Sequence, residues 1–264
     1  MMQRFVVVLL VYLVSACASI PAQPGPEVWN VLAPTGKLRI GVYPGSPTSM
    51  IRDSASGEIK GVTVDLGIEM AKRLGIPFEL IEYGRVEEVL AGMKAGQVDF
   101  TVTNATAARA KYVDFTQPIL AMELGYLVPS GSQISSLADL DRTGIRVGVT
   151  QGSTSQRTLP GLLKSASVIP APSIKAAMEM LSHGRLDTFA TNKAILFEMS
   201  DALLGSRVLD GRWGLEHMAI AIPKGRESGM AYVRRFANDA ISEDMVARAA
   251  KRAGLRGSIK VESQ

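Results

Sequence analysis

Two stretches of the chain repeat one pattern of apolar and polar positions. Apolar residues over 86–93 recur at the i, i+3, i+4 and i+7 spacing of one helix face, and Gly96 follows as a C-terminal cap. Residues 174–181 repeat this spacing before Gly184. A short apolar strand comes after each glycine. The pattern therefore predicts two copies of a helix followed by a strand.

Short sequence matches accompany both copies in the same order. RIGVYPGS begins at Arg39 and RVGVTQGS begins at Arg146, and beyond the capping glycines Asp99 corresponds to Asp187. The intervals between these landmarks differ, which a solenoid of equal repeats would not show. The matches favour two related α/β halves.

The rest of the pattern alternates strands with helices, which predicts a mostly parallel sheet with helices on both sides. The tail after Pro223 has no sheet of its own to cover, so we expect it to pack back on the first half. The chain would then cross between the halves twice, near 121–129 and near 217–223, and two crossings make a hinge. The expected strands are 38–42, 78–83, 98–103, 113–116 (stopped by Pro118), 121–128 and 217–223, and the expected helices are 61–75, 86–95 and 227–255.

The first residues predict export from the cytoplasm. Arg4 precedes a run of apolar residues that is too short to span a bilayer, and small residues follow, as in a secretory signal. Leu-Val-Ser-Ala-Cys at 13–17 resembles the bacterial lipoprotein box, in which the cysteine is lipidated and becomes the new N-terminus. We therefore expect a signal peptide over 1–17, a lipid-anchored Cys17 and a flexible linker over 18–35. The alternative is ordinary cleavage after Ala18.

Composition narrows the class of function. The formal charge is +4 and no Lys/Arg run is interleaved with aromatic residues, so nucleic acid is not an expected partner. The two histidines have no metal-ligand spacing around them, and the chain has no P-loop, G-x-S-x-G or H-E-x-x-H motif. We therefore expect no metal and no cofactor, and binding rather than catalysis.

Four segments follow directly after predicted strands. They are 43–46, 150–154, Asn104 and Asn192. Ligands of open α/β sheets bind outside the carboxyl ends of the strands, so these segments should line one cleft between the halves. The GSP and GST loops also offer free backbone N–H groups, which favour an anion.

Arg109 is the sharpest single candidate. It follows a run of small residues that cannot cover it, and a guanidinium binds a carboxylate through two parallel hydrogen bonds. Without further context, Arg109 could equally be a surface residue beside Lys111.

Several motifs together resemble one protein family. Residues 57–83, the AGQVDF segment and residues 106–118 around Arg109 are similar to the family 3 extracellular solute-binding proteins, the polar amino acid receptors of bacterial ABC importers. VGVTQGST and GRLDTFATN resemble parts of the family's second lobe. The resemblance covers 36–255.

The resemblance implies an α/β fold with two lobes that close on a ligand like a flytrap, each lobe a mostly parallel sheet flanked by helices. Residues 36–127 and 217–264 would form lobe 1, and residues 128–216 would form lobe 2. It also implies a periplasmic receptor whose partners are a small anionic or zwitterionic solute and the membrane permease of an ABC importer.

The resemblance further implies roles for single residues. Arg109 matches the arginine that grips the α-carboxylate of the ligand, and Ser153 and Thr154 match the second-lobe residues that complete this grip. Thr103 and Asn104 fall near hydrogen-bonding positions of the loop. The candidate ligand-binding residues are Tyr43, Ser46, Thr103, Asn104, Arg109, Ser153, Thr154 and Asn192.

The sequence departs from the family pattern where the ligand's α-ammonium should bind. Asn192 occupies the place of the aspartate that pairs with this group, and a neutral amide does not offset a buried cation. We therefore expect a small carboxylate without a free α-ammonium, unless another acid such as Asp53 or Glu198 reaches the cleft. The alternatives are a strict amino acid receptor, or an enzyme like cyclohexadienyl dehydratase, which needs an acid in the cleft.

Overall fold

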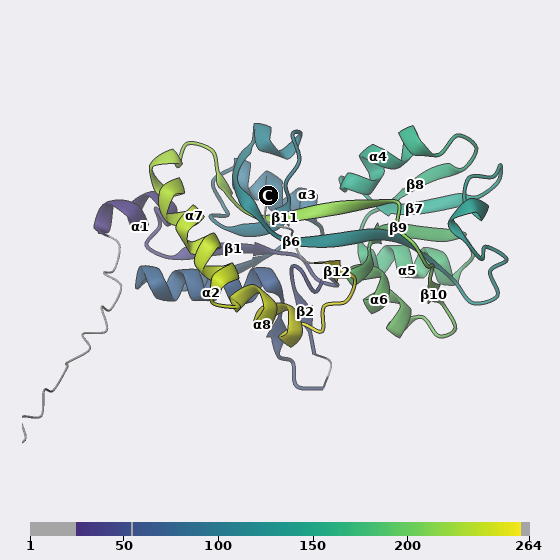
Figure 1. Cartoon of the computed structure of the whole chain (residues 1–264), viewed down its shortest axis with the longest axis horizontal. Coiled ribbons are helices and arrows are strands. Elements are labelled where there is room, and N and C mark those ends of the chain that lie inside the picture. Colours follow the sequence, from purple (N-terminus) through teal and green to yellow (C-terminus); the bar gives the residue numbers. More distant parts are fainter. Residues whose placement is uncertain (1–24, 54, 260–264) are drawn as a thin grey trace, which may run out of the picture.

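Two lobes are joined by a pair of long strands in the computed structural model, which describes residues 25–53 and 55–259 (Figure 1). The strands are β6 (Val113–Val128) and β11 (Gly214–Pro223), and they pair antiparallel. The expected signal peptide and Cys17 lie outside the described residues. Within the described part, no helix is both long and apolar enough to cross a membrane.

The first lobe contains the early strands and most of the tail. β1 and β4 pair parallel, β1 meets the start of β5 through a bridge between Ile40 and Phe100, and β5 pairs antiparallel with β11. Helices α2, α7 and α8 pack into one core with β1, so the helices of the tail lie against the early part of the chain. The elements of this lobe are α1 (Pro26–Leu32), β1 (Leu38–Val42), β2 (Ile51–Arg52), β3 (Ile59–Lys60), α2 (Val62–Leu74), β4 (Phe78–Glu82), α3 (Val86–Lys94), β5 (Thr101–Asn104), η1 (Arg109–Lys111), α7 (Glu227–Ser242) and α8 (Met245–Arg252).

The second lobe repeats the arrangement of strands and helices. β7, β8 and β9 run parallel, and β9 pairs antiparallel with residues 124–127 of β6. The limits expected between the lobes, 127/128 and 216/217, remain a prediction. The elements of this lobe are η2 (Leu137–Asp139), β7 (Arg146–Thr150), α4 (Thr154–Leu162), β8 (Ser167–Ala171), α5 (Ile174–Ser182), β9 (Thr188–Asn192), α6 (Lys193–Ala202) and β10 (Arg207–Val208).

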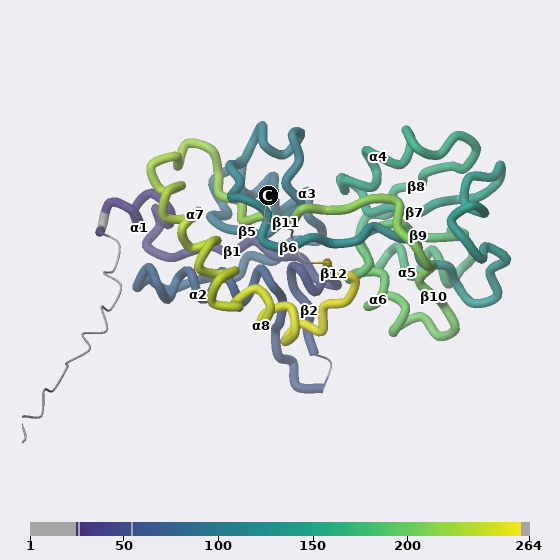
Figure 2. The backbone as a smooth tube through the Cα atoms, in the orientation of Figure 1, coloured from purple at the N-terminus to yellow at the C-terminus, as the bar shows by residue number. Residues whose placement is uncertain are grey.

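One mixed sheet therefore runs through the molecule, parallel toward its second-lobe edge and antiparallel in the middle, in the order β5-β11-β6-β9-β7-β8. After α8 the chain turns back, and β12 (Ser258–Ile259) pairs with β6 at Met122 and Ala121 (Figure 2). The end of the described chain thus lies beside the crossing between the lobes.

The repeated sequence landmarks form the same contact in each lobe. The backbone N–H and the Nε of Arg39 donate to Oδ2 of Asp99 at 2.9 and 2.8 Å, and its Nη2 donates to Oδ1 at 2.7 Å. Arg146 and Asp187 make the three equivalent bonds at 2.7, 2.9 and 2.8 Å. Each pair fixes the beginning of the lobe's first strand, because an arginine binds a carboxylate through two parallel bonds. We call these pairs the arginine–aspartate clamps.

Three expectations about single elements are wrong. Pro118 does not end a strand, since β6 runs through it and Pro118 lies opposite Ala219 at a shift of register, where its missing N–H is tolerated. The expected linker over 18–35 includes helix α1, whose Leu32 is buried in the first lobe's core. The helical tail is broken between α7 and α8 at Asp244, which has a φ of 57°.

Candidate functional site

A pocket lies between the lobes at the ends of their strands. About 470 Å³ of empty space, part of it open to solvent, lies between its lining residues. Seven of the eight candidate residues line it, all except Ser46. The other lining residues are Gly84, Arg85, Val86, Thr150, Ile174, Thr191, Ile195, Glu216 and Met218.

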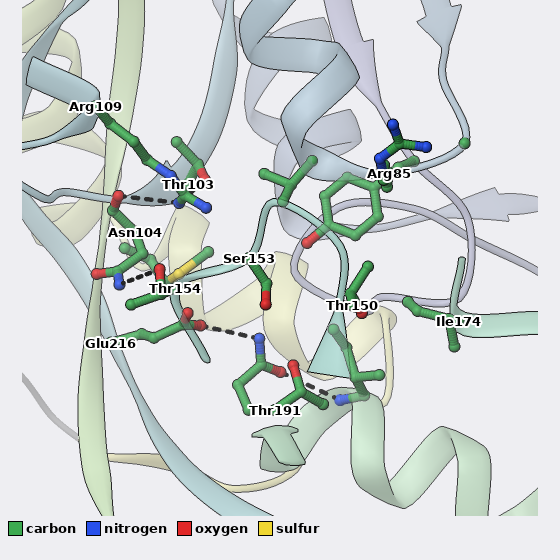
Figure 3. Close-up of a pocket in the computed structure, with 16 residues that line it drawn as sticks. Arg85, Thr103, Asn104, Arg109, Thr150, Ser153, Thr154, Ile174, Thr191 and Glu216 are labelled. Atoms are coloured by element: carbon green, nitrogen blue, oxygen red, sulfur yellow. Dashed lines mark hydrogen bonds between the residues drawn. The ribbon is translucent and has the colours of Figure 1, made fainter. Parts of the chain in front are cut away.

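Arg109 is buried at the first-lobe wall of this pocket. Its Nη1 donates to Oγ1 of Thr103 at 2.7 Å and to the backbone oxygen of Asn104 at 3.1 Å (Figure 3). Its Nε is buried and has no hydrogen-bond partner among the described residues. Burial lowers the pKa of the guanidinium from its ordinary value, and the negative charge of Glu216 works against this. A buried, unpaired N–H is costly, so an anion in the pocket would satisfy it.

The second lobe presents the beginning of α4 to the pocket. Ser153 is the N-cap of this helix and accepts a hydrogen bond from the N–H of Gln156 at 3.2 Å. Both Ser153 and Thr154 line the pocket. The free N–H groups at the start of a helix carry partial positive charge. Arg109 and α4 thus approach the pocket from different lobes with the same sign of charge.

Asn104 connects three elements through its side chain. Its Oδ1 accepts from the N–H of His217 at 2.9 Å, and its Nδ2 donates to Oγ1 of Thr154 at 3.2 Å. The side-chain amide therefore ties β5 to the crossing strand β11 and to α4 in the other lobe. It lines the pocket, but both of its ends already have protein partners.

Asn192 is likewise occupied by the protein. Its Oδ1 caps α6 by accepting from the N–H of Ile195 at 3.2 Å, and its Nδ2 donates to Oε2 of Glu216 at 3.0 Å (Figure 3). The amide oxygen therefore serves as the cap of this helix.

Glu216 is the residue that sequence reasoning missed. It stands on β11 at the crossing between the lobes, and 9% of its surface is exposed. Burial raises the pKa of its carboxyl above the ordinary value, while the charge of Arg109 and the hydrogen bond from Asn192 lower it. An acid at the start of the apolar run 217–223 was the available signal.

The acid in the cleft is therefore neither of the two that we named. Asp53 is in an exposed turn, where its Oδ1 accepts from the N–H of Ser56 at 2.8 Å, and Glu198 on α6 pairs with Arg256 at 3.6 Å. The expectation of a ligand without an ammonium rested on a cleft that lacks an acid. Because Glu216 is an acid in the cleft, that expectation no longer has its basis.

Ser46 does not face the pocket because the turn after β1 folds on itself. Its Oγ and Oγ1 of Thr48 are 2.9 Å apart, and its N–H donates to the oxygen of Met50 at 3.2 Å. Tyr43, three residues earlier, lines the pocket and packs against the second lobe's core beside Ile174. Burial raises the pKa of its hydroxyl.

The two lobes are in contact across the pocket. Besides the bond from Asn104 to Thr154, Nη1 of Arg85 lies 3.5 Å from the backbone oxygen of Pro172. Arg85 is itself neutralised by Glu88, with Nη1 and Oε1 2.6 Å apart. The structure is therefore a closed form.

Comparison with known proteins gives the same fold and one family. The amino acid ABC transporter substrate-binding protein AbpA of Streptococcus pneumoniae, solved with L-arginine, matches with a TM-score of 0.76 at 19% identity over 85% of this chain and 97% of that one. An ancestral amino acid-binding protein described as a precursor of cyclohexadienyl dehydratase matches with a TM-score of 0.72 at 23% identity over 83% and 96%.

Comparison of sequences also identifies the family of this chain. The ABC transporter glutamine-binding protein GlnH of Bacillus subtilis is 26% identical over 73% of this chain and 71% of its own length. The model of one family matches residues 38–254, which contain both lobes and every residue of the pocket. The chain belongs to the bacterial extracellular solute-binding proteins, family 3.

Proposed function

We propose that this protein is the substrate-binding component of an ABC importer and captures a small carboxylate-bearing solute between its lobes. The observation that carries the proposal is Arg109, which lines the same pocket as the beginning of α4 and whose buried Nε has no hydrogen-bond partner among the described residues. Two positive groups from different lobes attract one anion, and the anion then holds the lobes together.

The comparisons support this role at a coarser level. One relative of similar length is named as the glutamine-binding protein of an ABC transporter, others are named as glutamine- and cystine-binding proteins, and the family is described as extracellular. The partner would be a membrane permease that accepts the closed form. A lipid on Cys17 would keep the receptor at the membrane surface of the periplasm.

Calorimetry with small carboxylates and amino acids tests the proposal, after a thermal-shift screen to find the ligands. A solute present at about a hundred times its Kd stabilises the folded protein by about 2.7 kcal/mol. Arg109→Met should abolish binding, because it removes the cationic partner of the carboxylate. Arg234→Met, at an exposed position on α7, is the matched control and should bind normally.

The proposal fails if no carboxylate binds, or if Arg109→Met binds as tightly as the natural protein. Arg109→Met removes the hydrogen bonds to Thr103 and to the backbone oxygen of Asn104 together with the charge, so the fold of the variant has to be checked. Circular dichroism of both variants checks that they are folded.

A dehydratase on the same fold is the second candidate, and Glu216 is the observation in its favour. A buried carboxylic acid with a raised pKa is the kind of group that protonates a leaving group. Turnover of prephenate or arogenate by the purified protein, lost in Glu216→Gln, would establish catalysis. Binding without turnover would leave the receptor role.

A further inference from the structure

We propose that Glu216 selects between two classes of carboxylate in this pocket. When its carboxyl is ionised, Glu216 binds the ammonium group of an α-amino acid. When the carboxyl is protonated, the same pocket binds a 2-hydroxy acid instead. The inference rests on the proposed function, because it takes the solute's carboxylate to be held by Arg109.

The first support is the arrangement of two opposite charges in one enclosed site. Arg109 and Glu216 both line the pocket and are 5% and 9% exposed. They influence each other's charge, yet they form no ion pair among those found in the described part of the chain. Figure 3 shows Asn104 and Thr154 between them. A solute that carries both charges on neighbouring atoms could reach both side chains at once.

The second support is the free oxygen of Glu216. Asn192 donates to Oε2 at 3.0 Å and is the one hydrogen-bond partner of this carboxylate within the described residues. Oε1 therefore remains available to a ligand. Asn192 also lines the pocket and holds the other oxygen by this bond, so the asparagine positions the acid.

The third support is Asn192, because an asparagine at this position leaves the ammonium of an amino acid without an acid there. A buried ammonium needs a charged partner, and the asparagine at 192 cannot be one. Asn192 and Glu216 together provide an amide and a carboxylate where one acid would otherwise be needed. The negative charge that would pair with the ammonium thus lies on β11, the strand that crosses between the lobes, and not at the end of β9.

Few charged or titratable groups lie near Glu216, so a change of affinity with pH can be assigned to its carboxyl. Arg109 faces it from η1, the Tyr43 hydroxyl faces it from the turn after β1, and the neutral Asn192 faces it from the start of α6. His217 is the next residue on β11 and is exposed. Lys193 is engaged by Glu123, with Nζ and Oε2 2.7 Å apart.

Opposite pH dependences follow for the two classes of solute. An ammonium stabilises the ionised carboxyl, so an amino acid should bind more tightly as pH rises through the pKa of Glu216. A 2-hydroxy acid brings its negative charge without a compensating cation, so it should bind less tightly over the same range. One proton is involved, so each slope is at most about tenfold per pH unit.

The experiment is calorimetry with matched pairs between about pH 4.5 and about pH 8, a range around the ordinary carboxyl pKa and above it. The pairs are alanine with lactate, aspartate with malate, and glutamate with 2-hydroxyglutarate. Within each pair, the affinity of the amino acid should rise with pH and the affinity of the hydroxy acid should fall. Glu216→Gln should flatten both slopes and weaken the amino acid by about tenfold or more, while Glu216→Asp should keep both.

Glu123→Gln is the matched control, because Glu123 is an acid beside the same crossing that does not line the pocket. It should leave both slopes unchanged. Binding that depends on Arg109 but has the same slope for both members of a pair, or a slope that survives in Glu216→Gln, overturns this inference and leaves the proposed function intact. Binding that does not depend on Arg109 overturns both.

Discussion

Glu87 on α3 lies directly against Gly152 in the loop after β7. The two lobes can approach this closely because Gly152 has no side chain. A Cβ added at Gly152 would lie 2.5 Å from the Cβ of Glu87 and closer still to its carboxylate. Gly152 also has a φ of +73°, which glycine adopts without strain. The closed form therefore depends on a glycine at this position.

Gly152→Ala should weaken ligand binding more than it weakens the fold. The added methyl forces α3 and the loop apart, so closure becomes less favourable and affinity should fall by about tenfold or more. Gly131→Ala is the control, because Gly131 has the same φ of +73° but open space around it. Both variants should lose about 1 kcal/mol of unfolding free energy through backbone strain. Equal affinities in the two variants would show that this contact is not needed for binding.

The two arginine–aspartate clamps should contribute unequally to stability. The Asp99 side chain is 0% exposed and also pairs with Arg226 at 2.8 Å, whereas the Asp187 side chain is 30% exposed. Asp99→Asn should therefore cost about 3–5 kcal/mol, because it leaves two arginines without their buried partner. Asp187→Asn should cost about 1 kcal/mol or less. Urea denaturation measures both, and equal losses would contradict this account.

Glu216 should also affect the stability of the solute-free protein. Its pKa is raised in the folded state, so the folded protein binds the proton more tightly than the unfolded chain does. Its contribution is fully present below the ordinary glutamic acid pKa and is lost as pH rises through the folded value. The unfolding free energy should fall less with rising pH in Glu216→Gln than in the natural protein. Identical pH profiles in urea would contradict the raised pKa.

The lipid anchor remains a prediction that the N-terminal sequence alone supports. If Cys17 is lipidated, the protein should sediment with membranes, and Cys17→Ser should release it or leave the signal uncleaved. Stable attachment needs more than one acyl chain. Mass spectrometry of the mature protein decides the question, because an N-terminus at Ser19 would show ordinary cleavage instead.

The sequence predicted where the pocket lies, because a general rule governs its position. Ligands bind where parallel strands end, so Asn104, Thr154 and Asn192 could be placed from strand patterns alone. The rule gives no direction for a single side chain. It could not show that the amide groups of Asn104 and Asn192 are already occupied by other parts of the protein.

Glu216 could not be placed in the same way. Its side chain reaches the pocket because of the register of β11 against β6, where Glu216 lies opposite Met122, and that register includes two shifts. A shift of one residue turns a strand's side chains to the other face, and the sequence does not show where shifts occur. The same shifts let β6 continue through Pro118, which a rule for regular strands excludes.

The clamps bind Arg39 and Arg146 at the far ends of β1 and β7, and the pocket lies at the near ends of the same strands. Each strand is therefore fixed at its start and delivers its final loop to the ligand in a set position. Such preorganisation means that little loop entropy is lost on capture, and loop ordering is one of the main costs of association. A solute of a few atoms can then supply enough binding energy to keep two whole lobes together.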